Sequence, residues 1–163
     1  MLFHLSIEAD DPRHVAHVLA EIWQGEALPF PPVGRGSWMA FANDDKGTMI
    51  EVYPRGTEMR ETLGDRADAH GALVMPRRGT ATHMAIGTKL DQAAILAIAT
   101  REGWSAKYCR RGDAFGVIEV WIDGCQLVEV LTPEMQAEYV GAVTVQNWKA
   151  ALAAGVLVTH EAA

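Results

Sequence analysis

One arrangement occurs twice along this chain: a histidine in a strand-like run is followed more than forty residues later by a glutamate in another. His4 is followed after 47 residues (51 − 4) by Glu51, and His83 is followed after 46 residues (129 − 83) by Glu129. The runs that carry these residues are 3–7, 49–53, 82–86 and 126–131. Such self-similarity predicts two copies of one supersecondary unit.

Length and composition favour a globular protein made of one ordinary domain or two small fused modules. The chain has 163 residues, of which 49% are apolar, enough for a buried core. No uninterrupted apolar run approaches the length of about 18 residues that a membrane span requires. The N-terminus also lacks the basic start and long apolar core of a secretory signal. We therefore expect a cytoplasmic protein.

The charge of the chain argues against two classes of partner. Its formal net charge is −7, whereas nucleic acids and anionic membranes normally require a basic surface. The arginine pairs at 77–78 and 110–111 are too short to provide one. Cys109 and Cys125 are interpreted as structural thiols in a reducing compartment, because two cysteines make no disulfide framework in a chain of this length.

Residues 1–55 are expected to form the first unit. Alternating polarity indicates strands, an aspartate followed by proline starts a helix, and closely spaced prolines and glycines break regular structure. The expected elements are a strand at 2–8, a helix from 12 to about 24 that stops at Gly25, a loop at 29–36, and strands at 37–42 and 48–53. In the first strand His4 points away from the main apolar stripe.

Residues 80–132 are expected to repeat that order as a second unit. The expected elements are a strand at 81–87, a helix at 91–102, and strands at 105–110, 116–122 and 125–131. The glycines that end the two helices, Gly25 and Gly103, are 78 residues apart (103 − 25), the same offset as the two glutamates (129 − 51). An Asp-Gly pair at 123–124 predicts a tight hairpin turn between the last two strands.

The remaining segments are a connection and a C-terminal extension. Residues 56–79 connect the two units and are expected to contain a short helix at 58–63 or a strand at 72–75. Residues 133–163 have no counterpart in the first unit and are expected to contain helices at 133–140 and 144–154.

The second of these C-terminal helices carries an apolar set at helical spacing. Its members are Val145, Trp148, Leu152 and Val156. We expect them to pack within the protein. The alternative that they contact a partner subunit, which would make the protein a homodimer, stays open.

Four polar residues occupy matching strand positions in the two units: His4, Glu51, His83 and Glu129. Each alone is more often solvated or hydrogen-bonded, and His14 and His17 are interpreted as solvated surface residues. Burying a polar group without a partner costs about 2–7 kcal/mol, so four matched positions favour a shared reason. Two imidazoles and two carboxylates suit Zn, Ni, Co, Mn or Fe(II), with positions left for water or substrate. The pattern therefore predicts a divalent transition metal.

The order of one strand, one helix and three strands, together with the four runs above, resembles the vicinal oxygen chelate superfamily over residues 1–55 and 80–132. This superfamily includes glyoxalase I, methylmalonyl-CoA epimerase, extradiol dioxygenases, and fosfomycin and bleomycin resistance proteins. The resemblance implies an α+β fold in which two tandem βαβββ modules form a curved mixed sheet around a cleft, followed by the helical extension at 133–163.

The resemblance also implies a metal held by His4, Glu51, His83 and Glu129, a ligand pattern closest to that of glyoxalase I. It implies a metal-dependent lyase or isomerase that acts on a small carbonyl or hydroxy-carbonyl substrate through a metal-stabilised enolate or enediolate. Glu129 would be the catalytic proton shuttle, with Glu51 as the second choice. Residues that share strand faces with these ligands are expected to bind the substrate: Ser6, Met49, Tyr53, Ala85, Leu127 and Leu131.

Two other functions stay open. A non-catalytic protein that binds a drug or another small molecule, as bleomycin resistance proteins do, would use the same cleft without turnover. An Fe(II) extradiol-type dioxygenase would consume oxygen with catechols. The chain departs from the superfamily in its last hairpin, at 122–126, and it carries no recognisable glutathione-binding signature.

Overall fold

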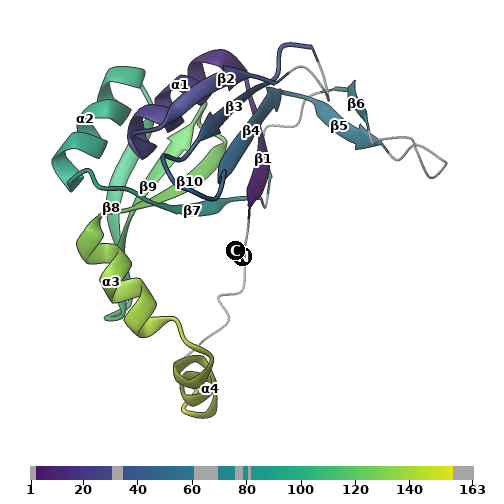
Figure 1. Ribbon diagram of the computed structural model, residues 1–163. Helices are drawn as coiled ribbons and strands as arrows, with labels where there is room; N and C mark the ends of the chain where they lie inside the picture. The colour runs from purple at the N-terminus through teal and green to yellow at the C-terminus, as the bar shows by residue number, and fades with distance from the viewer. Residues whose placement is uncertain (1–2, 31–34, 61–69, 76–78, 81, 156–163) are drawn as a thin grey trace.

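The structure is a computed structural model that describes residues 3–30, 35–60, 70–75, 79–80 and 82–155 (Figure 1). The first module consists of β1 (His4–Ala9), α1 (Pro12–Trp23), β2 (Glu26–Pro29), β3 (Trp38–Phe41) and β4 (Met49–Pro54). The second consists of β7 (Met84–Gly87), α2 (Gln92–Glu102), β8 (Ser105–Arg111), β9 (Phe115–Ile122) and β10 (Gln126–Leu131). Both modules therefore have the expected order of one strand, one helix and three strands.

Each module forms a four-stranded mixed sheet, and the two sheets have the same topology. Their strand orders are β1-β4-β3-β2 and β7-β10-β9-β8. In each sheet the first strand of the module pairs parallel with the last, and the other neighbours pair antiparallel. The predicted α+β fold built from two βαβββ modules is confirmed.

The two module helices begin in the same way. Asp11 accepts a hydrogen bond from the backbone N–H of His14 (3.0 Å), and Asp91 accepts one from that of Ala94 (2.8 Å). Each aspartate thereby satisfies a backbone donor that has no partner within its helix. α2 ends at Gly103 as predicted, with φ at 70°. In α1, however, the left-handed residue is Gln24, with φ at 54°, and Gly25 follows it.

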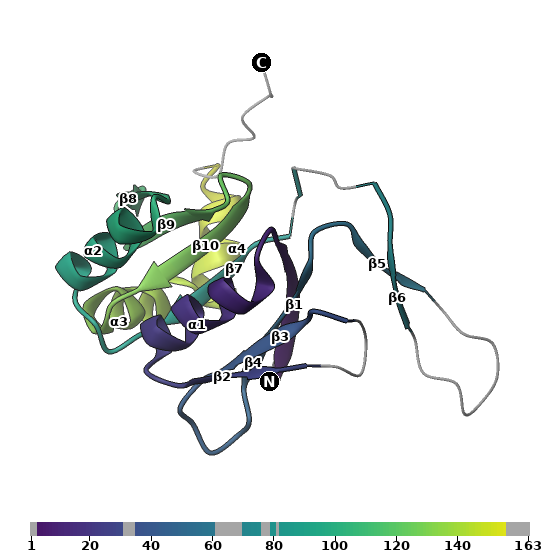
Figure 2. The same cartoon turned by 90° about the horizontal axis from the view of Figure 1, so that it is seen from above.

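One continuous hydrophobic core joins the modules. Residues from both helices and both sheets belong to it, among them Leu19, Ile50, Ile95 and Val128, each at most 1% exposed. Figure 2 shows α1 and α2 side by side over the sheets. At their contact the exposed side chain of His14 approaches Glu102, with Nε2 2.5 Å from Oε2. His14 is an exposed surface residue, as expected, and its imidazole also forms a hydrogen bond with Glu102 between the two modules.

The prediction of a loop at 29–36 is only partly correct. Glu26–Pro29 forms β2, which pairs antiparallel with β3, while residues 31–34 lie outside the described part of the chain. Sequence reasoning missed this strand because it is short and ends in a proline. A proline is tolerated there because β2 is the edge strand, where an N–H can be absent from the ladder.

The connection between the modules forms a small hairpin instead of the helix expected at 58–63. β5 (Thr57–Arg60) pairs antiparallel with β6 (His70–Leu73), and Figures 1 and 2 show the hairpin projecting from the body of the molecule. The intrinsic helix preference of a short segment is a weak signal, which cross-strand hydrogen bonds override here. The alternative strand expected at 72–75 lies two residues earlier, and residues 61–63 lie outside the described part.

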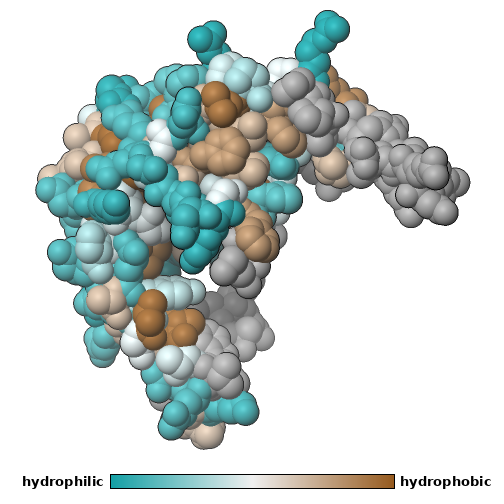
Figure 3. All heavy atoms as spheres, viewed as in Figure 1, coloured by the Kyte–Doolittle hydropathy of each residue, from teal (hydrophilic) through white to brown (hydrophobic). Residues whose placement is uncertain are grey.

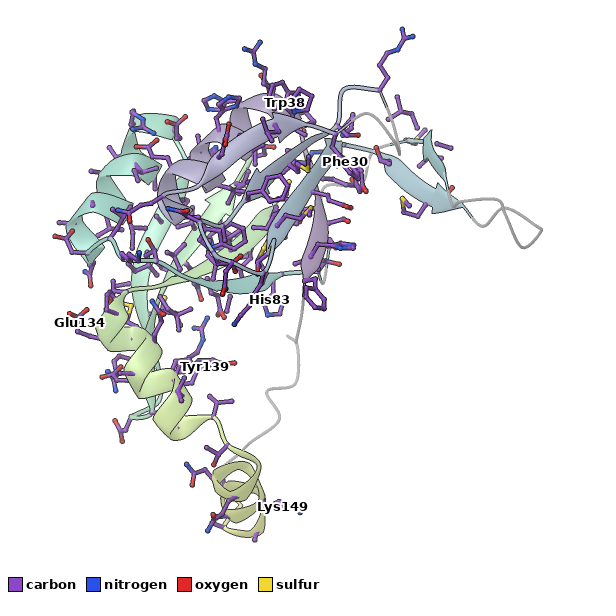
Figure 4. All side chains as sticks on the ribbon, viewed as in Figure 1. Phe30, Trp38, His83, Glu134, Tyr139 and Lys149 are labelled. Carbon is purple, nitrogen blue, oxygen red and sulfur yellow. The ribbon has the colours of Figure 1, made fainter. Side chains whose placement is uncertain are left out.

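The C-terminal extension contains α3 (Pro133–Ala142) and α4 (Val145–Ala153), as predicted. α3, which carries Tyr139 (Figure 4), packs on the second module. The ring of Tyr139 lies edge-on to that of Phe115, with 4.9 Å between the ring centroids. α4 stands away from both sheets (Figure 1). The side chains of Val145, Trp148 and Leu152 lie outside the described part of the structure, so their expected packing stays a prediction. Val156 lies outside the described residues.

Apolar surface is exposed where α3 meets α4. Val140 and Val143 both face solvent there, and Figure 3 shows apolar side chains gathered on this part of the molecule. Cys109 and Cys125 are both free thiols. None of the helices in the described residues combines the length and the apolar character needed to cross a membrane.

Candidate metal and substrate site

The repeat in the sequence corresponds to matching strand registers in the two modules. In the parallel pair of β1 and β4, Ser6 lies opposite Glu51, and His4 is two residues before Ser6. In the parallel pair of β7 and β10, Ala85 lies opposite Glu129, and His83 is two residues before Ala85. The histidine and glutamate of each module therefore stand in the same diagonal relation across the same pair of strands.

Alternation along the strands places these residues on the sheet face that the helix does not cover. In the first module Ile7, Ile50 and Val52 point toward α1 and are almost fully buried. Residues one step out of phase point to the opposite face. That face of the first sheet carries His4 and Glu51.

Glu51 is held by two hydroxyl groups. Its residue is only 8% exposed, and its Oε2 accepts a hydrogen bond from Ser6 Oγ (2.8 Å) and another from Tyr53 Oη (2.6 Å). Burial raises the pKa of Tyr53 to about 12, and the hydrogen bond to Glu51 adds to this effect. Tyr53 therefore remains a proton donor at neutral pH. The structure brings together three of the predicted site residues here.

Glu129 is held differently, by a cation. Its side chain is 16% exposed, and its Oε1 accepts a short hydrogen bond from Nη2 of Arg111, which also donates to Glu119 Oε1 (2.8 Å). The hydrogen bond from Arg111 lowers the pKa of Glu119. Sequence reasoning missed both Arg111 and Glu119. The available signal was the hairpin register of β8, β9 and β10, which places the two glutamates directly opposite each other.

Two cavities of about 490 Å³ each lie along β1. The first, here called the His4 cavity, receives His4 and Met49 from the first module and Ala85 from the second. The second, called the Ser6 cavity, has a lining of mixed polarity to which both modules contribute. Its lining includes Ser6, Tyr53, Arg55, Thr82 and Gln126. Gln126 Nε2 donates to the carbonyl oxygen of Thr82 (2.7 Å), which fixes the amide at the cavity wall.

The remaining predicted residues lie elsewhere. Leu131 is buried, and neither it nor Leu127 lines either of these two cavities. His83 directly precedes β7 and is exposed (Figure 4). Within the described ranges of a single chain, no three or more His, Cys, Asp or Glu side chains lie close enough together to hold a metal ion. A centre made of all four predicted ligands stays a prediction.

Solved structures with the same fold are known. No protein-family model matches this chain, and no curated protein matches it by sequence. The fosfomycin resistance protein FosX from Listeria monocytogenes superposes with a TM-score of 0.56 at 14% identity, over 86% of this chain and 97% of that one. Glyoxalase I from Leishmania major gives a TM-score of 0.51 at 13% identity, over 96% and 99% of the two chains.

A third similar structure is lactoylglutathione lyase from Agrobacterium tumefaciens, with a TM-score of 0.50 at 16% identity, over 82% of this chain and 94% of that one. The chain therefore has the same paired βαβββ fold as these three structures. Identities this low establish the fold alone, so the activity has to be argued from the residues of this chain.

Proposed function

We propose that this protein is a divalent-metal-dependent enzyme that moves a proton next to the carbonyl group of a small carbonyl or hydroxy-carbonyl substrate, in a lyase or isomerase reaction. The observation that carries this proposal is the matched register of the histidine and glutamate in the two modules. Surface residues chosen independently have no reason to share one diagonal relation in both parallel strand pairs.

The donor set fits a metal of borderline character. His4, Glu51, His83 and Glu129 would hold it, since imidazole and carboxylate together suit Zn, Ni, Co, Mn or Fe(II). A structure of FosX from Listeria monocytogenes with Mn(II) and sulfate has a TM-score of 0.54 to this chain at 12% identity. When bound, such an ion acts as a Lewis acid that polarises a substrate carbonyl and makes the neighbouring C–H group more acidic.

The residues of the chain supply orientation and proton transfer. Ser6 and Tyr53 hold Glu51 in one orientation and limit its access to water. Glu129 would take the proton from the carbon next to the carbonyl and return it to a neighbouring atom, once its Oε1 has left Arg111. The Ser6 cavity, with hydroxyl and amide groups in its wall, suits a small polar substrate.

We further propose that two copies of the chain share each metal centre. One chain offers equivalent half-sites, His4 with Glu51 and His83 with Glu129, but its described residues do not gather three ligands. A homodimer in which the first module of one copy faces the second module of the other would unite the four residues. The enzyme would then be an obligate dimer.

A mixing experiment tests both points. The double variants His4→Ala/Glu51→Ala and His83→Ala/Glu129→Ala are each expected to lose metal binding. If centres form between chains, unfolding and refolding the two variants together regenerates one intact centre in each mixed dimer. Metal content by mass spectrometry and loss of the substrate C–H signal in D₂O, followed by NMR with hydroxy-carbonyl compounds, report the result. If the wild-type protein takes up no transition metal, the proposal of a metal-dependent enzyme is refuted.

A second function is favoured by one observation, the contact of Arg111 with Glu129. Because this carboxylate already has a cationic partner, the chain could act without a metal as a small-molecule-binding protein. In that case the metal-free protein would bind ligands unchanged after His4→Ala and His83→Ala, and no substrate proton would exchange.

A further inference from the structure

Glu129 and Glu119 form a close pair of carboxylates. They lie directly opposite each other on β10 and β9, and their side chains are 16% and 12% exposed. Like charges at directly opposite positions destabilise a sheet, more so where water is partly excluded. The pair therefore requires a compensating positive charge.

Arg111 and Lys107 provide this charge from β8. Both lie on the same face of that strand, and Lys107 is opposite Glu119, with its Nζ 3.6 Å from Oε2. Arg111 Nη2 reaches both glutamates. Glu119 thus has two cationic partners, whereas within the described ranges the ion pairs of Glu129 are limited to Arg111.

The two equivalent glutamates differ in what a bound cation would do to their partners. Glu51 is held by the neutral hydroxyls of Ser6 and Tyr53, which can stay in place beside a metal ion. Arg111 cannot do so at Glu129 without strong repulsion between like charges. Its side chain is 37% exposed, and Arg111 is the last residue of β8, directly before Gly112 with φ at 57°, so the side chain has room to move.

We propose that Arg111 is a resident counter-ion of Glu129. A divalent cation that binds Glu129 displaces Arg111, and Glu119 then retains the displaced guanidinium group. This inference rests on the proposed metal-dependent function. In the metal-free protein, Arg111 neutralises a carboxylate pair that would otherwise repel. In the metal-bound protein, Glu119 holds the guanidinium away from the ligand, so that Arg111 sets the affinity for the ion as a positioning residue.

Full-length variants at Arg111, Lys107 and Glu119, stripped of metal with a chelator, test the proposal. Their dissociation constants for Mn(II), Co(II), Ni(II) and Zn(II) are measured by competition with a chromophoric chelator. Arg111→Gln is expected to bind metal at least about tenfold more tightly than wild type, because a charge-assisted competitor is gone. Lys107→Gln changes the net charge equally without touching Glu129, and it is expected to shift the constant by less than about threefold.

Glu119→Gln is expected to act in the opposite direction and weaken metal binding about tenfold, since Arg111 then has no second partner. A double-mutant cycle separates this effect from loss of a nearby negative charge. In the Arg111→Gln background, Glu119→Gln is expected to have little effect. Arg111→Lys serves as a second variant that keeps the charge but lacks the planar fork, and its affinity should lie between those of wild type and Arg111→Gln.

Thermal unfolding gives a readout that does not depend on activity. Arg111→Gln is expected to lower the melting temperature of the metal-free protein and to leave that of the metal-loaded protein nearly unchanged. If the wild-type protein binds metal and the variants Arg111→Gln and Lys107→Gln bind it equally tightly, the counter-ion role of Arg111 alone is overturned. Absence of metal binding in wild type and Arg111→Gln alike would overturn the proposed function together with this inference.

Discussion

Arg55 of the first module donates a hydrogen bond from Nη2 to Oδ2 of Asp123 in the second module, over 2.8 Å. The same oxygen accepts from the backbone N–H of Asp10 (2.8 Å), and Arg55 Nε pairs with the Asp10 carboxylate. The Arg55 side chain is only 9% exposed. Asp123 occupies the turn between β9 and β10 with φ at 54°. The end of β4 is thus fastened to the last hairpin of the other module.

Arg55→Met is expected to destabilise the protein by about 2–4 kcal/mol, because it leaves two carboxylates near one another without their buried cation. Urea unfolding followed by circular dichroism measures the change. Arg35→Met, at an exposed position, is the matched control and should change stability by less than about 0.5 kcal/mol. A similar small change in Arg55→Met would show that this ion pair does not hold the modules together.

Tyr53→Phe removes one donor to the buried Glu51 carboxylate and is expected to cost about 1–3 kcal/mol. Its pH dependence is also specific. The raised pKa of Tyr53, about 12, compared with its ordinary value of 10.0, means that the unfolded chain releases the proton first as pH rises. The contribution is therefore complete below pH 10 and disappears between about pH 10 and 12.

Spectrophotometric titration of the folded protein checks this value. One tyrosine of the three should ionise near pH 12 in wild type, and that step should be missing in Tyr53→Phe. Tyr139→Phe, on α3, is the control that should retain it. Ionisation of all three tyrosines near pH 10 would contradict the proposed burial and hydrogen bond of Tyr53.

Gly25→Ala is expected to destabilise the protein by several kcal/mol, because a Cβ at this position would lie 1.8 Å from the carbonyl oxygen of Phe41. Gly141→Ala, in α3, provides the opposite case. Nothing lies within 4 Å of its Cβ, and alanine favours a helix over glycine by about 0.5–1 kcal/mol. Thermal unfolding of both variants measures the difference, and equal effects would contradict the close approach at Gly25.

Glu102→Gln tests the contact between α1 and α2. Burial opposes ionisation of Glu102, but hydrogen bonds from Arg101 and His14 outweigh it and place the carboxyl pKa below its ordinary value of 4.5. A lowered pKa contributes stability that is present above pH 4.5 and is lost as the pH falls through the folded value. Wild type should therefore lose more stability below pH 4.5 than Glu102→Gln does. Glu26→Gln, at an exposed carboxylate of β2, is the control and should lose as much stability below pH 4.5 as the wild-type protein.

The elements of this fold follow largely from local signals in the sequence. Capping aspartates, the glycine after α2 and the Asp-Gly turn at 123–124 act within a few residues, and alternating polarity fixes which strand face is buried. These signals predicted both modules and the matching positions of His4, Glu51, His83 and Glu129. They were insufficient for β2 and for the paired strands β5 and β6, which form only because a partner strand is present.

The partners of the predicted ligands were decided by tertiary structure. That Glu51 accepts hydrogen bonds from Ser6 and Tyr53, while Glu129 faces Arg111 and Glu119, depends on the registers of strands far apart in sequence. A one-residue change of register would turn each of these side chains to the opposite face. The sequence by itself determined where the two histidine–glutamate pairs lie along the chain, and only the packed sheets decided which charged and polar groups surround them.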